Sequence, residues 1–243
     1  MAGLTRRDLA AVTLSAPLAC AGCSDTGFGD DSALQVDDQS GLNATSVSQK
    51  LDLDVADPGG ASTLTPLVAA PDRRPPVCIG GARHSMGGQS LPPAEGVAVT
   101  FRPPALAVGP QHDVYTAGAG CRWRDVINQL DPLGLSPRVM QSNCDFSIGG
   151  SISVNAHGWA VPRGPLGSTV RRLRVMLADG SRIHCSPTEE PQLFSACIGG
   201  YGLPAAILDA DLVPAVNTLL ERTAEVLAAD HFGDRFESRG IAY

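Results

Sequence analysis

The chain has 243 residues, of which 43% are apolar and 18% are charged, and its formal net charge is −7. This length suffices for one large domain or for one and a half ordinary ones. Lys50 is the only lysine among 18 basic residues, which argues against nucleic-acid binding, and 27 Gly with 19 Pro argue against a coiled coil or helical bundle.

Residues 1–23 have the layout of an export signal. Arg6 and Arg7 precede an apolar run over residues 10–22 that is too short to span a bilayer. The paired arginines are typical of twin-arginine signals, and the segment ending at Cys23 is similar to a lipoprotein cleavage site. We therefore expect an exported protein, periplasmic or attached to the membrane only through a lipid on Cys23. The alternative is an apolar N-terminus without a targeting role, or a start codon placed too early.

The next segment is acidic. Residues 24–57 contain eight aspartates, and Lys50 is their only basic neighbour. Such a stretch repels itself and tends to remain solvated, so we interpret residues 24–40 as a linker. Calcium binding is the alternative, but the Asp-x-Asp-x-Asp-Gly spacing that arranges oxygens around one ion is missing.

Cysteine usage indicates neither a disulfide framework nor a zinc site. Five of the seven cysteines follow the predicted signal, and no Cys-x-x-Cys pair occurs among those five. We predict that most of them are small buried residues and that the protein has no metal site.

The main body alternates short predicted strands with helices. Residues 77–79, 97–101 and 113–116 are rich in β-branched or aromatic residues, as strands are. Over residues 123–130, apolar side chains at i, i+3, i+4 and i+7 predict a helix with one buried face. A Rossmann motif is not expected, because Trp123 stands where the third glycine of Gly-x-Gly-x-x-Gly would be needed.

Further elements are predicted toward the C-terminus. Asp179-Gly180 between two apolar runs, 170–177 and the run opening at Ile183, predicts a hairpin whose two central residues both need φ > 0. Alternation over residues 206–213 predicts a half-exposed strand, and an apolar stripe over residues 217–230 predicts an amphipathic helix. Together these elements indicate an α+β fold.

Two glycine-rich segments carry the chemistry. The first, residues 79–89 (Ile-Gly-Gly-Ala-Arg-His-Ser-Met-Gly-Gly-Gln), follows a predicted strand, and its glycines allow successive backbone N–H groups to turn toward an anion such as a pyrophosphate. His84 lies in its middle, where an imidazole has no obvious packing role. The second, residues 142–159, contains the run Ser-Ile-Gly-Gly-Ser-Ile-Ser-Val-Asn-Ala-His-Gly over residues 147–158, which combines glycines with small hydroxyl and amide donors and contains His157.

In sequence and order these segments resemble the two FAD-cradling motifs of the vanillyl-alcohol oxidase/p-cresol methylhydroxylase family, whose members include sugar-lactone, alditol and cytokinin oxidases or dehydrogenases. Residues 118–125, 177–180 and 193–202 resemble further family motifs in the same order. The resemblance implies an α+β FAD-binding domain over residues 41–215, made of two subdomains that hold FAD between them and followed in the family by a substrate or cap domain.

The resemblance also implies roles for single residues. The first loop would wrap the pyrophosphate, the second would line the pyrophosphate and ribityl chain, and Ile207 would contact the cofactor mainly through its backbone. In many members the histidine at the position of His84 is bonded to the flavin 8α-methyl group, which requires a neutral imidazole nitrogen; the alternative is that His84 only hydrogen-bonds a phosphate or a carbonyl. The predicted cofactor-binding residues are Gly80, Gly81, Ala82, Arg83, His84, Ser85, Gln89, Gly149, Gly150, Ser153, Asn155, His157, Gly158 and Ile207.

Two features depart from the family. After Gly202 the family has a large apolar residue, Phe, Gly and then Val or Ile, whereas this chain has Leu-Pro-Ala-Ala-Ile over residues 203–207. Proline removes a donor, and alanine adds a Cβ beside the flavin. We also expect residues 216–243 to be the helical start of a truncated second domain. Because that domain usually supplies the substrate contacts and the catalytic base, neither a substrate nor a catalytic residue is predicted.

The favoured hypothesis is an exported FAD-dependent oxidoreductase acting on a CH–OH donor, in which the flavin accepts a hydride and passes electrons to oxygen or a carrier. The alternatives are a non-catalytic flavin-binding remnant, one half of a split oxidase, and a periplasmic metal-binding protein that uses His84, His157 and cysteines, which no ligand spacing supports. The expected partners are a small-molecule substrate and a separate cap domain or electron acceptor protein.

Overall fold

The computed structural model describes residues 34–54, 63–67, 69, 75–102, 106–158, 163–219 and 224–239. The predicted export signal at 1–23 and residues 24–33 of the predicted linker lie outside these ranges. Within the described ranges, no helix is both long and apolar enough to cross a membrane.

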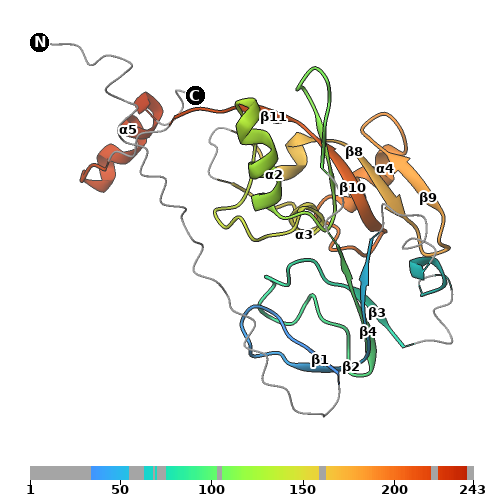
Figure 1. The fold of residues 1–243 in the computed structure, drawn as a ribbon. Helices are drawn as coiled ribbons and strands as arrows, with labels where there is room; N and C mark the ends of the chain where they lie inside the picture. The colour runs from blue at the N-terminus through green and yellow to red at the C-terminus, as the bar shows by residue number, and fades with distance from the viewer. Residues whose placement is uncertain are drawn as a thin grey trace, which may run out of the picture. The chain divides into compact units, whose positions relative to one another are not determined.

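The first sheet has four strands in the order β1-β2-β4-β3 (Figure 1). β1 (Gln35–Val36) is antiparallel to β2 (Thr45–Leu53), whereas β2 and β3 (Val77–Ile79) are both parallel to β4 (Gly96–Phe101). The strands predicted at 77–79 and 97–101 are confirmed. The predicted linker boundary at residue 40 is placed too late, because β1 already belongs to the sheet.

The second sheet has five strands in the order β5-β6-β10-β8-β9, and all its pairings are antiparallel. Its strands are β5 (Ala107–Val108), β6 (Tyr115–Gly118), β10 (Ala206–Leu212), β8 (Val170–Met176) and β9 (Arg182–Cys185). The strands predicted at 170–177 and 206–213 are confirmed, and the one predicted at 113–116 begins two residues later. The hairpin from β8 to β9 is confirmed, but only Gly180 of its turn has a positive φ, at 83°, and the Asp179 carboxylate accepts hydrogen bonds from Ser181 instead.

Short helices and one ribbon complete the described elements. They are a helix over residues 63–67, α2 (Trp123–Leu130), α3 (Ile148–Ser153), α4 (Pro191–Cys197), α5 (Phe232–Arg239), three 3-10 helices (Asp131–Leu133, Leu166–Thr169, Ala229–His231) and the antiparallel pair β7 (Leu135–Pro137) and β11 (Pro214–Val216). The predicted helix at 123–130 is confirmed: Trp123, Val126 and Leu130 are buried, and the Asp125 carboxylate accepts the backbone N–H of Arg122 at 2.9 Å, as at a capped N-terminus. The α+β fold is confirmed.

The helix predicted at 217–230 is wrong. Residues 217–219 and 224–228 are not helical, and α5 begins only at Phe232. Leu219 and Val226 are fully exposed, and Leu227 is only half-buried, so none of the described residues on the predicted apolar face is buried. A short helix without a packed face is only marginally stable in water.

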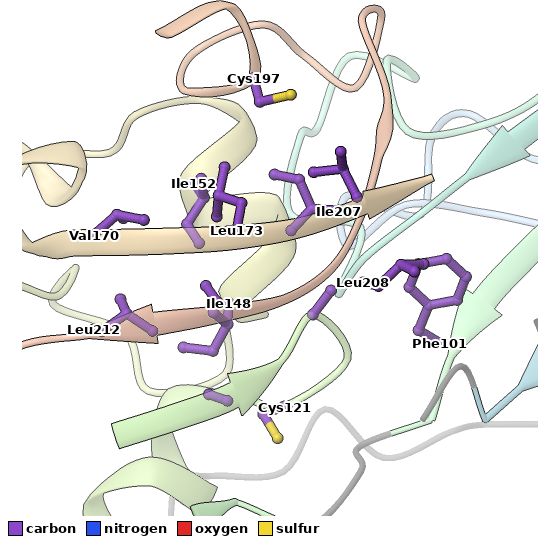
Figure 2. Packing of buried hydrophobic residues seen from close by; sticks show 14 of the residues in the cluster. Phe101, Cys121, Ile148, Ile152, Val170, Leu173, Cys197, Ile207, Leu208 and Leu212 are labelled. Carbon is purple, nitrogen blue, oxygen red and sulfur yellow. The ribbon is translucent and has the colours of Figure 1, made fainter. Parts of the chain in front are cut away.

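One apolar core joins elements of both sheets (Figure 2). Ile148 and Ile152 of α3 are fully buried together with Leu173 of β8 and Leu208 of β10. Phe101, at the end of β4, belongs to the same cluster. Burial of these side chains therefore fixes α3 and the end of the first sheet beside the second sheet, which is where the glycine-rich segments lie.

Candidate functional site

A cleft of about 830 Å³ lies where the loop after β3, the end of β4, the β6–α2 connection, α3 and the segment before β10 meet. It brings together the two glycine-rich segments, which the sequence separates by about sixty positions. The predicted cofactor-binding residues that line the cleft are Gly80, Gly81, Ala82, Arg83, His84, Ser85, Gln89, Gly149, Gly150, Ser153 and Ile207.

The glycine loop, residues 80–89, places unpaired backbone donors in the lining of the cleft. Among the described residues, no hydrogen-bond acceptor is found for the backbone N–H groups of Gly81, Arg83, His84 and Ser85. Arg83 has a φ of 53°, in the left-handed region. Alternation of left-handed and ordinary conformations turns successive N–H groups toward one point, which is the arrangement that an anion needs.

The Arg83 side chain adds a further donor beside the loop. Its Nη2 donates to Thr100 Oγ1 at 2.9 Å, and its Nε is so close to Gly80 that a Cβ there would lie 3.0 Å away. Within the described part of the chain this buried Nε has no acceptor, and burial lowers the pKa of the guanidinium. A buried N–H without a partner is costly, so Nε indicates a place for an acceptor from a ligand.

The turn between β1 and β2 holds the glycine loop from outside. Asp38 Oδ2 accepts the backbone N–H of Gly88 at 2.9 Å and the Asn43 side-chain amide at 2.8 Å, and the backbone N–H of Gln39 donates to the Arg83 carbonyl at 3.0 Å. Asp38 and Gln39 fall in the predicted linker, and nothing in their local pattern indicates this contact. The predicted linker therefore contributes to the site through its last residues.

We expect Asp38→Ala to loosen the glycine loop, seen as several-fold faster hydrogen exchange of the Gly88 amide. The Ser40 hydroxyl, with further hydrogen bonds, holds the pKa of Asp38 below its ordinary value of 3.8. Because the pKa is lowered in the folded state, the stabilisation is complete above the ordinary value of 3.8 and is lost as the pH falls through the folded-state pKa. Acidification should therefore have the same effect as the substitution.

The matched control for this prediction is Asp179→Ala. Asp179 also accepts hydrogen bonds from a serine two residues on, but it lies in the β8–β9 turn. If the Gly88 amide exchanged equally slowly in Asp38→Ala and Asp179→Ala, Asp38 would not hold the glycine loop as described.

α3 and the residue before it supply the opposite wall of the cleft. The Ser147 Oγ accepts the backbone N–H of Ala82 at 3.1 Å and so links the two glycine-rich segments. A Cβ at Gly81 would overlap the Ser147 Oγ, and a Cβ at Gly149 would lie 2.8 Å from the Cβ of Ala119. At Gly149 the backbone of Ala119 is also close, so a side chain does not fit there, whereas at Gly81 a side chain would displace the Ser147 hydroxyl and break its hydrogen bond to Ala82.

His84 is held in a defined orientation at the cleft. Its Nε2 lies 3.3 Å from Asp145 Oδ2, and its ring meets Phe146 edge to face with centroids 4.4 Å apart. Burial, and after it the positive charge of Arg122, lower the pKa of His84 below 6.5. The imidazole is therefore neutral at pH 7 and retains one basic ring nitrogen.

Asp145 is itself fixed by two arginines at the start of α2. Arg122 Nη1 lies 2.6 Å from Asp145 Oδ2, and Arg124 pairs with the other carboxylate oxygen. These three residues are absent from the set predicted from sequence. Asp145 falls within the second glycine-rich segment, and Arg122 and Arg124 fall within the stretch 118–125 that resembles a family motif, but neither pattern indicates the contact between them.

Three predicted cofactor-binding residues, Asn155, His157 and Gly158, do not line the cleft. Asn155 Oδ1 accepts the backbone N–H of Gly167 at 2.9 Å, and a Cβ at Gly158 would lie 2.5 Å from the Met140 carbonyl oxygen. The His157 side chain is exposed. Asn155 and Gly158 thus pack the loop after α3, and cofactor contact by these three residues stays a prediction that their positions do not support.

A family described as FAD binding domain matches residues 63–186, slightly more than half of the chain. The chain belongs to this family. The match includes the glycine loop, His84, Asp145 and the second glycine-rich segment, and the predicted resemblance is confirmed.

The relatives of this FAD binding domain are longer chains that extend well beyond the matched part. Cytokinin dehydrogenase 8 of Oryza sativa subsp. indica is 33% identical over 147 residues, which are 55% of this chain and 27% of that protein. Cytokinin dehydrogenase 4 of Arabidopsis thaliana is 33% identical over 134 residues, 52% of this chain and 25% of that protein. Alditol oxidase of Streptomyces sp. is 29% identical over 142 residues, 57% of this chain and 34% of that protein. The matched part thus spans a quarter to a third of these relatives.

The cleft of the FAD binding domain fits its cofactor. The unpaired N–H groups of the glycine loop and the buried Arg83 Nε are donors suited to a diphosphate. The glycines at the closest approach keep side chains out of the backbone-lined part of the cleft. Phe146 and Ile207 provide apolar surface for a ring system, and Leu203, Pro204 and Ala205 line the cleft where the sequence departs from the family.

Proposed function

We propose that this chain is the FAD-binding part of an oxidoreductase that acts on a CH–OH donor. The observation that carries the proposal is that residues 81 and 83–85, whose backbone N–H groups are unpaired within the described chain, line one cleft together with the oriented His84. When bound, the flavin accepts a hydride and passes the electrons to oxygen or a carrier.

The residues of the chain bind and orient the cofactor in this proposal. The N–H groups of Gly81 and residues 83–85, with Arg83 Nε, hold the diphosphate by charge-assisted hydrogen bonds. The close contact between the Gly81 and Gly149 segments sets the width of the cleft. Ile207 and Phe146 exclude water from the apolar part, and His84 either attaches covalently to the flavin or hydrogen-bonds it.

The choice of a CH–OH donor is supported by the alditol oxidase relative, whose name denotes a sugar-alcohol substrate. The cytokinin dehydrogenases are the alternative guide, since their name denotes cytokinins. The paired Arg6-Arg7 signal supports a further part of the proposal, namely that the protein is exported. The partner of this chain in the proposal is a cap domain or an electron acceptor protein on a separate chain.

The test is reconstitution of the purified full chain with FAD, compared with riboflavin, which lacks the diphosphate. We expect a yellow complex with FAD that survives gel filtration and contains about one flavin per chain. Riboflavin should bind at least about 100-fold more weakly, because two or more charge-assisted hydrogen bonds are lost. A chain that takes up no FAD, or that binds riboflavin equally well, contradicts the proposal.

Anaerobic addition of substrates to the reconstituted protein distinguishes the substrate classes. Bleaching of the flavin absorbance by alditols supports the CH–OH donor, and bleaching by cytokinins alone replaces it with the second class. A stable flavin complex whose absorbance is bleached by neither substrate class favours the non-catalytic alternative or the need for a separate cap domain. Adding the protein product of a neighbouring gene and repeating the measurement would distinguish these two.

A further inference from the structure

The contact between His84 and Asp145 does more than line the cleft. Asp145 Oδ2 lies 3.3 Å from His84 Nε2 and 2.6 Å from Arg122 Nη1. Its other oxygen pairs with Arg124, and its backbone N–H donates to Asn143 Oδ1 at 2.8 Å. The carboxylate is therefore oriented by groups other than the imidazole, so its position restricts the imidazole rather than the reverse.

This arrangement selects one tautomer of His84. Two guanidinium groups favour the ionised carboxylate, and an ionised carboxylate can only accept hydrogen bonds. The contact with Nε2 is then a hydrogen bond only when the ring proton is on Nε2. Because the ring is neutral, Nδ1 must carry the lone pair, and among the described residues no hydrogen bond to Nδ1 is found.

The ring plane is restricted as well. Phe146, the residue after Asp145, meets the imidazole at an interplanar angle of 84°. The His84 side chain is 17% exposed, and its rotation would break both this edge-to-face contact and the hydrogen bond to Asp145. Both ring nitrogens thus have fixed and different roles.

We propose that Asp145 is a positioning residue that holds neutral His84 as the Nε2–H tautomer and so makes Nδ1 the nitrogen that bonds covalently to the flavin. The inference rests on the proposed function, that is, on FAD binding in this cleft. It assigns a role to an aspartate that is not among the residues predicted to bind the cofactor.

The reaction balances with dioxygen as the oxidant. The Nδ1 lone pair forms a carbon–nitrogen bond to the 8α carbon, and the imidazole and the methyl group each lose one hydrogen. The two protons and two electrons leave on dioxygen as hydrogen peroxide. Asp145 assists because bond formation at Nδ1 places positive charge on the ring, and an anion beside Nε2–H stabilises that charge.

The first test needs no flavin. In the ¹⁵N-labelled apo chain, long-range ¹H–¹⁵N spectra report which ring nitrogen of each histidine carries the proton, and His84→Gln identifies the His84 signals. We expect the Nε2–H tautomer in the wild type, its loss or mixing in Asp145→Ala, and no change in the control Asp179→Ala. An Nδ1–H tautomer in the wild type, or an unchanged tautomer in Asp145→Ala, overturns the proposal.

The second test follows flavin attachment after mixing apo protein with FAD in air. Asp145→Ala should bind FAD non-covalently as the wild type does but form acid-stable flavin at least about tenfold more slowly. Equal rates overturn the proposal. If the alanine variant does not fold, the same measurements are made on the isosteric Asp145→Asn, whose side chain is neutral and a weaker acceptor. Failure of the wild type to bind FAD would refute the proposed function separately, and the tautomer test would still stand.

Discussion

Replacing His84 with alanine is expected to abolish acid-stable flavin, whereas replacing His157 should leave it unchanged. Both histidines lie in glycine-rich segments, but His84 lines the cleft and is held by Asp145 and Phe146, while His157 is exposed and outside the cleft lining. Only a ring nitrogen at the cleft can bond to a flavin bound there.

The measurement is the flavin absorbance of protein precipitated with acid and redissolved in denaturant. His84→Ala should show background absorbance but still bind FAD reversibly, with an affinity lowered by no more than about tenfold for one lost hydrogen bond. Acid-stable flavin in His84→Ala would contradict the assignment. A wild type that binds FAD only reversibly would leave His84 with the hydrogen-bonding role alone.

Replacing Gly120 with alanine is expected to destabilise the protein by about 3 kcal/mol and to weaken FAD binding, because overpacking against a rigid neighbour forces the backbone to shift. Gly120 lies in the β6–α2 connection and lines the cleft. A Cβ there would overlap the Phe101 carbonyl oxygen and lie 2.7 Å from that of Arg102. Both are backbone atoms at the end of β4, so the substitution pushes the first sheet away from the second.

Urea denaturation of the wild type and the variant measures this effect, and titration with FAD measures the weaker binding. The matched control is Gly233→Ala in α5, where a Cβ would meet no atom within 4 Å. That change should be neutral or stabilising by up to about 1 kcal/mol, since alanine favours a helix more than glycine does. Similar free energies of unfolding for Gly120→Ala and wild type would show that the two sheets do not meet as closely as described.

Much of the fold follows from local patterns. The β-branched residues of β4, the apolar stripe of α2 and the Asp179-Gly180 hairpin are properties of short segments, and the structure confirms all three. The predicted helix at 217–230 is wrong because its formation depends on tertiary contacts rather than on local pattern alone. Its apolar residues have helical spacing, but such a stripe stabilises a helix only if a partner surface buries it.

The site divides in the same way. The glycine loop could be found from sequence because several glycines after a strand have a direct backbone consequence. Asn155, His157 and Gly158 continue the second segment in sequence, yet they turn away from the cleft after α3 ends at Ser153. A motif defines which residues are neighbours along the chain and does not define where the chain turns.

The sequence by itself determined several short strands, the helix at 123–130, the glycine-rich loop, His84 as the candidate for a bond to the flavin and the family of FAD binding domains. Only the tertiary structure decided which residues act on that loop and on His84. Asp38 reaches Gly88, and Asp145 reaches His84, across long stretches of chain. The first contact depends on the pairing of strands within the first sheet, and the second on the packing of that sheet beside α3. Such long-range contacts have no signature in any local window of sequence.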